Sequence, residues 1–247
     1  MSYLGLAALE FRAWPGLKIV EFAAISILFA VLGRLVRGVT AGGAVAGAFV
    51  CFLLLWAGGL AAFTALFTVF VLTWFSTRIG YARKQRLGTA EARSGRDALQ
   101  VFANLGAAAV CAILFASFGR NGLLLAMIAA LAEPAADTVS SEIGQTSGGS
   151  PRLITTWQTA THGTNGAVTL TGTLAGAVAA CVVVFAFTFC GGLGPHFAFA
   201  CSAAGIFGML ADSLLGATIE NRGWLGNNVV NFLSTVVAAA IAFLIAH

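Results

Sequence analysis

The sequence AEPAADTVSSEIG, residues 132–144, ends a long apolar run with three carboxylates and a proline. Glu133, Asp137 and Ser141 recur every four residues, so on a helix they form one polar stripe, with Glu142 beside it. An ionised carboxylate at the centre of a bilayer costs roughly 2.5–3.5 kcal/mol on insertion scales. The stripe is therefore expected to face protein, water or a cation, and it is the first candidate for a functional site.

The composition of the whole chain predicts that this stripe lies in a membrane. Of 247 residues, 59% are hydrophobic and 9% are charged, against roughly 25% charged in an average soluble domain. The mean hydropathy is +0.94. The formal net charge of +4 is not interpreted as nucleic-acid binding, because the basic residues are segregated as membrane topology requires. The five cysteines lie in apolar runs without metal-ligand spacing and are expected to be packing residues.

The apolar segments predict an all-α, polytopic helical bundle with about eight transmembrane helices, in a single membrane domain over 1–247. Only the turn Trp56–Gly59 separates the segments 40–56 and 59–77, and the first of them is rich in small residues (AGGAVAGA), so this pair could instead be re-entrant. The N-terminus lacks a basic region before a long apolar one, so no cleaved signal peptide is expected. The eight segments lie near 16–33, 40–56, 59–77, 98–117, 122–141, 166–188, 196–218 and 228–246.

The distribution of basic residues predicts the orientation of these helices. If eight helices alternate, the loops after the first, third, fifth and seventh share a face and carry ten of the 13 Lys and Arg residues. Arg12, Lys18 and Arg120 fall on the other side. The positive-inside rule then places these loops in the cytoplasm and both termini outside, with the plasma (inner) membrane as the expected location.

Three helices become polar in their last turns, and each precedes a helix that begins with amide or hydroxyl groups. Their endings are WFSTRIG, AADTVSSEIG and LADSLLGATIE. This pattern predicts a repeated helical hairpin that delivers polar stripes to one cavity on the cytoplasmic side. The stripes of the following helices are Arg96, Gln100 and Asn104; Asn165, Thr169 and Thr173; and Asn227, Asn231 and Thr235.

The membrane-embedded acids are candidate ligands of Mg²⁺. Asp137 and Asp212 occupy equivalent places in AADT and LADS. Together with Glu142, and with Glu133 as a further member, they supply the oxygen ligands that Mg²⁺ takes beside substrate phosphates. The alternative is that these acids form salt bridges to the arginines of the basic loop.

Two loops are candidate phosphate-binding segments. The basic loop TRIGYARKQRLGTAEARSGRD, residues 77–97, suits a phosphate or polyphosphate ligand, although a topology signal and attraction to anionic lipid would also explain its charges. The loop TSGGSPRLITTWQTATHGTNG, residues 146–166, could cradle phosphates with backbone N–H groups or be an ordinary connector. His162 within it could shuttle a proton or be incidental.

Several separate segments of the chain, in order, resemble the DUF92, or transmembrane protein 19, family. That family includes the phytyl-phosphate kinases of tocopherol and phylloquinone synthesis. The resemblance covers about residues 75–240, and the first 70 residues resemble the family only in being apolar. The segments are KQRLGTAEARSGRDALQVFANLG (84–106), AADTVSSEIG (135–144), PRLITT (151–156), GTNGAVTLTGTLAG (163–176), ADSLLGATIE (211–220) and NNVVNFLST (227–235).

The resemblance implies a membrane kinase that converts an isoprenoid monophosphate, such as phytyl or geranylgeranyl phosphate, to the diphosphate. The phosphoryl donor would be CTP or another nucleoside triphosphate, with Mg²⁺. On this interpretation Asp137, Asp212 and Lys84 are catalytic, and Asp137, Glu142 and Asp212 hold the metal. Lys84 is expected to lie outside the apolar core. The residues implied to bind nucleotide or phosphate are Arg86, Arg96, Asn104, Asn165, Asn228 and Asn231.

Two other functional classes share some of these features. A transporter or flippase of a phosphorylated isoprenoid lipid would also use repeated hairpins, broken helices and acids within the membrane. It predicts a site that opens to both faces, whereas the outer half of this chain is nearly free of polar residues. A CDP-alcohol phosphotransferase would carry aspartates on consecutive turns of one helix, but Asp137 and Asp212 belong to different predicted helices.

Overall fold

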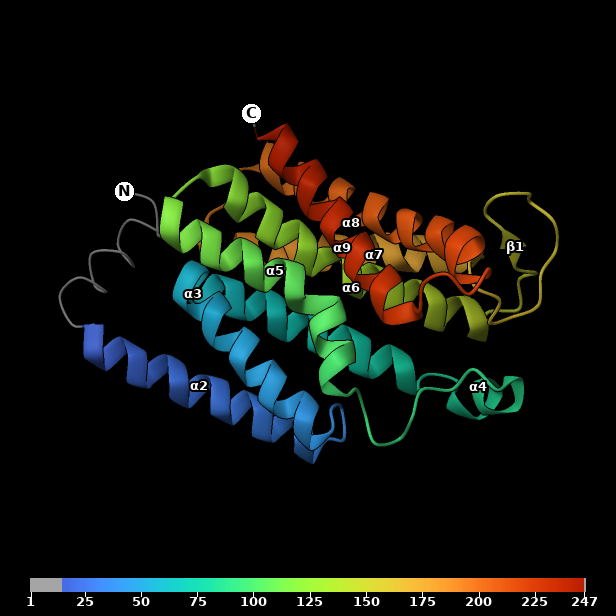
Figure 1. Ribbon diagram of the computed structural model, residues 1–247, viewed down its shortest axis with the longest axis horizontal. Helices are drawn as coiled ribbons and strands as arrows, with labels where there is room; N and C mark the ends of the chain where they lie inside the picture. The colour runs from blue at the N-terminus through green and yellow to red at the C-terminus, as the bar shows by residue number, and fades with distance from the viewer. Residues whose placement is uncertain (1–14, 247) are drawn as a thin grey trace.

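The computed structural model describes residues 15–246, and most of them lie in long helices (Figure 1). Seven of these helices are long and apolar enough to cross a membrane, which confirms the prediction of an all-α membrane bundle. Arg12 and the segment in which we expect no signal peptide lie outside the described residues. The helices are α2 (Pro15–Leu35), α3 (Ala41–Arg78), α4 (Tyr81–Leu87), α5 (Ala98–Phe118), α6 (Asn121–Thr146), α7 (Leu170–Gly191), α8 (Pro195–Leu215), the π-helical turn η1 (Gly216–Glu220) and α9 (Asn227–Ile245); the strands are β1 (Arg152–Leu153) and β2 (Ala167–Val168).

The longest helix, α3, consists of two membrane-length segments. A straight helix of 38 residues would span about 57 Å, nearly twice the hydrocarbon core of a bilayer. The helix breaks at Gly59, whose φ of 59° and ψ of −150° are open to glycine and strained for other residues. The indole of Trp74 and the guanidinium of Arg78 donate to the carbonyl of Val36, 3.1 and 2.7 Å away, just before the helix begins.

The two ends of α3 therefore lie together, and segments 41–58 and 60–78 form a helical hairpin (Figure 1). Each segment is long enough to cross a bilayer by itself. Counting both segments gives the eight spans that the hydropathy pattern predicts. The segment near 40–56 is a full helix and not a re-entrant loop.

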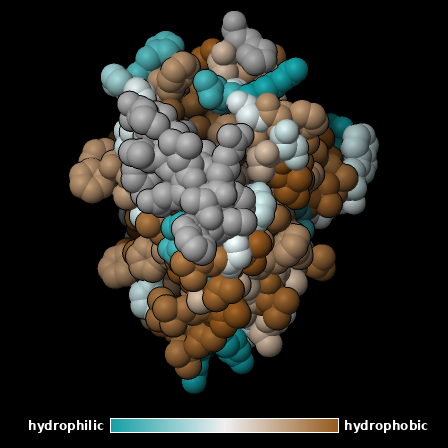
Figure 2. All heavy atoms as spheres, turned by 90° about the vertical axis from the view of Figure 1, so that its left-hand side faces the viewer, coloured by the Kyte–Doolittle hydropathy of each residue, from teal (hydrophilic) through white to brown (hydrophobic). Residues whose placement is uncertain are grey.

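The polar connections gather at one end of the bundle. Segments 79–97, 147–169 and 221–226 lie at the end that carries α4 and β1, on the right in Figure 1, and segment 36–40 joins the first of them, because Val39 pairs with Arg96. The turns at Gly59, 119–120 and 192–194 lie at the opposite end; Figure 2 views the molecule from that side and shows many hydrophobic side chains (brown) in its lower half. This arrangement confirms that the basic loops share one face of the bundle.

Helix α6 is the centre of the bundle. It packs against α3, α5, α7, α8 and α9, and 89% of its most apolar stretch is buried. Small residues let its neighbours approach closely; a Cβ on Gly176 of α7 would lie 2.6 Å from the carbonyl oxygen of Ala136. The helix continues through Pro134. Its central position puts the acidic stripe against protein instead of lipid, as the sequence predicts.

Two local features differ from the expectation. The segment predicted over 166–188 starts as a helix only at Leu170, because β2 pairs antiparallel with β1, with Arg152 opposite Val168. Helix α4 is not predicted, since its seven largely polar residues carry no hydropathy signal. Gly80 and Gly88 flank it, both with left-handed backbones.

Candidate functional site

A polar cavity of about 410 Å³ lies at the loop end of the bundle. Its volume is within the roughly 300–1,000 Å³ of small-molecule sites. Asp137 of α6 and Asp212 of α8 both line it, as the sequence predicts. The remaining lining residues are Gly88, Thr89, Ser140, Ser141, Gly144, Gln145, Pro151, the segment 162–169, Ser213, Gly216, Glu220 and Asn227.

The two aspartates form an interacting pair. Their carboxyl groups are close enough to influence each other electrostatically, and Glu220 of η1 acts on both. The buried hydroxyl of Ser234 on α9 donates to Oδ2 of Asp212 at 3.1 Å. The π-helical turn keeps Asp212 and Glu220 on the face that lines the cavity, and such turns are frequent at functional sites. Carboxylates from two helices therefore converge on one cavity.

Glu133 extends this acidic stripe into the core of the bundle. Its side chain is buried, and within residues 15–246 its Oε1 atom has no hydrogen-bond partner. Asp137 and Asp212 both act on it electrostatically. Gly208 of α8 makes room for it, because a Cβ there would lie 2.6 Å from Cγ of Glu133. A buried acceptor without a partner costs free energy, so this acid is kept for a reason other than packing.

The aspartate pair fits Mg²⁺ better than the predicted three-acid set does. Among the described residues, no group of three or more His, Cys, Asp or Glu side chains is arranged to hold a metal ion. Mg²⁺ bound with substrate phosphates, however, usually takes one or two carboxylates and completes its shell with phosphate oxygens and water. Asp137 and Asp212 meet that requirement, while Glu142 has a different partner.

Lys84 and Glu142 form a buried ion pair with each other and do not line the polar cavity, so their predicted roles stay predictions. The ammonium of Lys84 contacts Oε2 of Glu142 and donates to the carbonyls of Ser76 and Thr77 at 3.1 and 2.8 Å. The Lys84 side chain is fully buried, so the expectation that it lies outside the core is wrong. All three donors of the ammonium are occupied. The pair fastens α4 to α3 and α6.

The predicted phosphate-binding residues are divided among several places. Asn165 lines the polar cavity, and its carbonyl accepts from Asn221 at 3.1 Å. Asn228 and Asn231 line neither of the two cavities described here, whereas their neighbour Asn227 lines the polar one. Asn227 was identified in the sequence only as a member of a polar stripe.

Arg86 and Asn104 also lie away from the aspartates. The Arg86 side chain is exposed on α4, and its Nε donates to the carbonyl of Ala82 at 3.4 Å. Asn104 of α5 donates to the carbonyl of Gln100 at 2.7 Å and lines a second cavity instead of the polar one. Neither residue belongs to the set that surrounds Asp137 and Asp212.

The glycine-containing loop forms one wall of the polar cavity. Residues 162–169 all line it, including His162. Gly166 has a φ of 74°, and a Cβ there would lie 2.5 Å from the carbonyl oxygen of Ser213. Only glycine allows the loop to approach α8 this closely. The loop is thus part of the site and not a loose connector.

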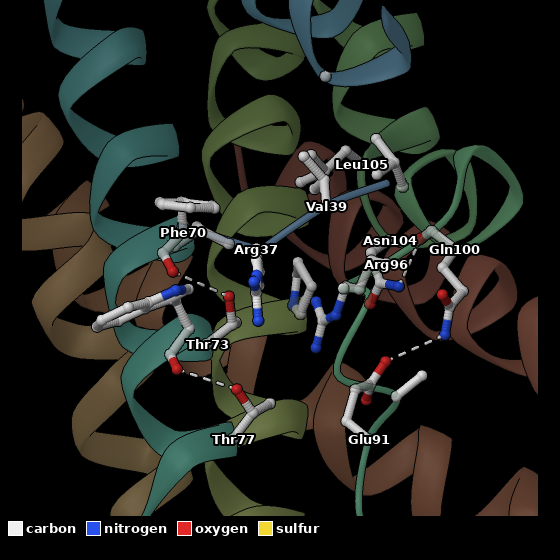
Figure 3. Close-up of a pocket in the computed structure, with 18 of the residues that line it drawn as sticks. Arg37, Val39, Phe70, Thr73, Thr77, Glu91, Arg96, Gln100, Asn104 and Leu105 are labelled. Carbon is white, nitrogen blue, oxygen red and sulfur yellow. Dashed lines mark hydrogen bonds between the residues drawn. The ribbon is translucent and has the colours of Figure 1, made fainter. Parts of the chain in front are cut away.

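The second cavity is largely apolar and has a volume of about 350 Å³. It lies between α2, both segments of α3 and α5, and reaches Pro134 of α6; Figure 3 shows its polar end. Sequence reasoning missed it, because segments far apart in the chain build it and its arginines were counted only for topology or phosphate binding. The lining residues are Phe29, Arg37, Gly38, Val39, Gly47, Leu66, Val69, Phe70, Thr73, Trp74, Thr77, Arg78, Tyr81, Glu91, Ala92, Arg93, Gly95, Arg96, Gln100, Val101, Asn104, Leu105 and Pro134.

Arg96 connects the two cavities. It lines the apolar cavity, and its guanidinium donates to the hydroxyl of Thr138 at 3.0 Å and attracts the carboxylate of Asp137. Its backbone is fixed, because its N–H donates to Gly38 at 3.1 Å and its carbonyl accepts from Thr40 at 2.9 Å. Arg96 thus lies beside Asp137, and its predicted phosphate-binding role stays a prediction.

Comparison with known proteins identifies the family. The family model described as integral membrane protein DUF92 matches residues 24–239. The chain belongs to the DUF92 family. The match begins well before residue 75, so the first helices are part of the family region and resemble it in more than apolar character.

Relatives in this family come from archaea, plants and cyanobacteria. An uncharacterised membrane protein of Methanocaldococcus jannaschii is 35% identical over 204 residues, covering 82% of this chain and 84% of that protein. The chloroplastic protein VTE6 of Arabidopsis thaliana is 34% identical over 232 residues, covering 89% and 69%. An uncharacterised membrane protein of Synechocystis is 37% identical over 179 residues, covering 67% and 66%. No solved structure matches the chain.

Proposed function

We propose that this protein is a membrane phosphotransferase that moves the terminal phosphoryl group of CTP or another nucleoside triphosphate to an isoprenoid monophosphate. The observation that carries the proposal is the Asp137–Asp212 pair in a polar cavity walled by a glycine-containing loop. The resemblance to a family that includes phytyl-phosphate kinases supports the same chemistry. Phosphoryl transfer needs mainly positioning and charge neutralisation, and this site offers both.

The polar cavity is the proposed place of the nucleotide's phosphates. Asp137 and Asp212 would hold Mg²⁺, and the bound ion would neutralise charge on the phosphate oxygens. The loop 162–169 and Asn165 would surround the polyphosphate. Ser234 orients the carboxylate of Asp212 through its hydrogen bond. Glu142 and Lys84 have no direct part in this step, since they satisfy each other.

The chain needs no strong general base for this reaction. The second pKa of a phosphate monoester is about 6, so an oxygen of the isoprenoid monophosphate is already ionised near neutral pH. That oxygen forms a bond to the terminal phosphorus of the nucleotide, the bond to the bridging oxygen breaks, and the nucleoside diphosphate leaves. Arg96, beside Asp137, is placed to stabilise charge on the transferred group.

A one-sided site supports a kinase over a transporter or flippase. The polar cavity is lined by the last turns of α6, by α8 and η1, by the start of α9, and by loops of the same end. None of its lining residues comes from the turns at the opposite end of the bundle. A transporter would need the site to open alternately to both ends.

The test is a phosphoryl-transfer assay on the purified protein in detergent, with phytyl and geranylgeranyl monophosphate as acceptors and CTP and ATP as donors. We expect formation of the isoprenoid diphosphate, abolished by a chelator and restored by added Mg²⁺. Absence of transfer from every donor and acceptor pair, with protein shown to be folded, would reject the kinase. Scrambling of lipid phosphate in vesicles would then support the flippase instead.

A further inference from the structure

The apolar cavity combines a hydrophobic interior with a cationic mouth. Its interior is lined by side chains such as Phe29, Leu66 and Leu105. Four arginines line it, against Glu91 as the one acid among its lining residues. The carboxylate of Glu91 already accepts from Gln100 at 3.2 Å. A cavity of this kind suits an amphiphile with an anionic head and an apolar chain.

The four arginines are not equivalent. The guanidinium of Arg78 donates to two carbonyls and stacks on Trp74, and that of Arg93 lies over the ring of Tyr81. In Figure 3, Arg37 and Arg96 extend into the space between α3 and α5. Within residues 15–246, the Arg37 guanidinium takes part in no hydrogen bond or ion pair. Arg37 is exposed, so its guanidinium is open to an anionic ligand at the mouth of the cavity.

The backbone at Arg37 fixes the place where that side chain leaves α2. Its φ is 55°, in the left-handed region that residues other than glycine, asparagine and aspartate seldom occupy. This conformation closes the end of α2, because the N–H of Gly38 donates to the carbonyl of Gly33 at 2.9 Å. Here the neighbouring Gly38 lies against Phe70 and Trp74, which holds the turn and directs Arg37 to the cavity.

We propose that this cavity binds a single-chain lipid monophosphate, with the phosphate between Arg37 and Arg96 and the chain along Phe29, Leu66 and Leu105. Guanidinium groups bind phosphate oxygens with two parallel hydrogen bonds. At about 350 Å³ the cavity is near the lower limit of ligand sites, which favours one chain over two. The inference deepens the proposed function, on which it rests for the acceptor's role.

The position of Arg96 explains how the acceptor would meet the nucleotide. A phosphate held by this guanidinium lies next to Thr138 and Asp137, at the boundary with the polar cavity. The attacking oxygen of the lipid phosphate would thus approach from the apolar cavity and the nucleotide from the polar one. The apolar chain stays away from the polar cavity throughout.

Gly47 offers a way to fill the cavity without disturbing the fold. It lines the cavity, and a Cβ added there would meet nothing within 4 Å. The variant Gly47→Phe should therefore occupy the space of the lipid chain. Gly16→Phe is the matched control, because Gly16 also has open space around it but lines neither cavity.

The experiment measures binding of radiolabelled geranylgeranyl monophosphate to the full chain in detergent, without nucleotide. We expect Gly47→Phe to weaken binding by about tenfold or more, a factor that corresponds to roughly 1.4 kcal/mol. Gly16→Phe should bind as the natural protein does. The charge-removing variant Arg37→Gln should also weaken binding about tenfold, whereas Arg34→Gln, a neighbour that does not line the cavity, should not.

Competition with three other ligands tests whether the cavity requires both a phosphate and a single apolar chain. Geranylgeraniol lacks the phosphate, inorganic phosphate lacks the chain, and a two-chain phosphatidic acid has both but is too wide. We expect none of them to displace the labelled lipid at equal concentration. Displacement by inorganic phosphate or by the phosphatidic acid would overturn the single-chain assignment.

The outcomes also separate this site from the proposed function. If Gly47→Phe and Arg37→Gln leave lipid binding unchanged, the site is wrong even where the protein transfers phosphate. If both variants lose binding and the natural protein transfers no phosphate, the site stands and the kinase falls. Because no nucleotide is present in the binding experiment, each result concerns the apolar cavity alone.

Discussion

The two cavities are lined mainly by different helices and differ in chemistry. The polar cavity is built mainly from the second half of the chain and contains Asp137 and Asp212. The apolar cavity is built mainly from the first half and contains four arginines and a hydrophobic interior. Helix α6 thus borders both a site suited to a nucleotide with Mg²⁺ and a site suited to a lipid phosphate. Arg96 links the two cavities, because it lines the apolar one and attracts the carboxylate of Asp137 in the polar one.

Two acids of α6, Asp137 and Glu142, have different surroundings and therefore different roles. Asp137 lines a cavity and is surrounded by other acids, while Glu142, five residues later, is closed off by the ammonium of Lys84. The sequence places both in one functional cluster. The structure divides them into an acid available to ligands and an acid that holds elements together.

The largest effect is expected from the aspartates. Asp137→Asn and Asp212→Asn should each lower the rate of phosphoryl transfer by roughly 10²–10³-fold, because each removes a charge that neutral asparagine cannot replace. The measurement is the transfer rate at saturating nucleotide and Mg²⁺.

Asp97→Asn is the control for both variants. Asp97 is the N-cap of α5 and lies outside both cavities, and asparagine is an equally good cap. This variant should keep its activity. Full activity in the Asp137 and Asp212 variants would remove both residues from the site.

The second effect concerns stability, and it sharpens the difference between Asp137 and Glu142. Lys84→Met should destabilise the protein by about 3–5 kcal/mol, because it leaves Glu142 buried without its partner. The midpoint of thermal unfolding in detergent should fall by about 10 °C.

Arg86→Met is the matched control, since Arg86 is exposed on the same short helix. It should unfold within about 2 °C of the natural protein. A Lys84 variant of normal stability but with weakened nucleotide binding would restore the role that the sequence suggests.

Much of the fold could be predicted from hydropathy and glycine placement. The apolar segments locate all eight spans, and the turn at Gly59 fits the break in α3. The burial of Lys84 could not be predicted, because its partner Glu142 is 58 residues away and the surrounding loop is otherwise basic. The role of Arg37 was hidden for a similar reason, since the left-handed backbone that directs it has no signature in the sequence.

The smallest effect tests the contact between the two cavities. Thr138→Val keeps the shape of the side chain but removes the acceptor that orients Arg96. The loss of one such hydrogen bond, about 1 kcal/mol, should lower the transfer rate about fivefold without changing nucleotide affinity. Thr235→Val is the control, because Thr235 is equally enclosed in α9 and lines neither cavity. Equal rates in the two variants would mean that Arg96 needs no support from α6.

The most direct test of the two-cavity account is to map bound ligands by photo-crosslinking and mass spectrometry of the natural protein. The probes are a nucleoside triphosphate with a photoreactive phosphate and a geranylgeranyl monophosphate with a photoreactive group along its chain. We predict that the nucleotide labels residues 162–169 and the end of α8, while the lipid labels α3 and α5 near Leu66 and Leu105. Labelling of the same residues by both probes would contradict the account.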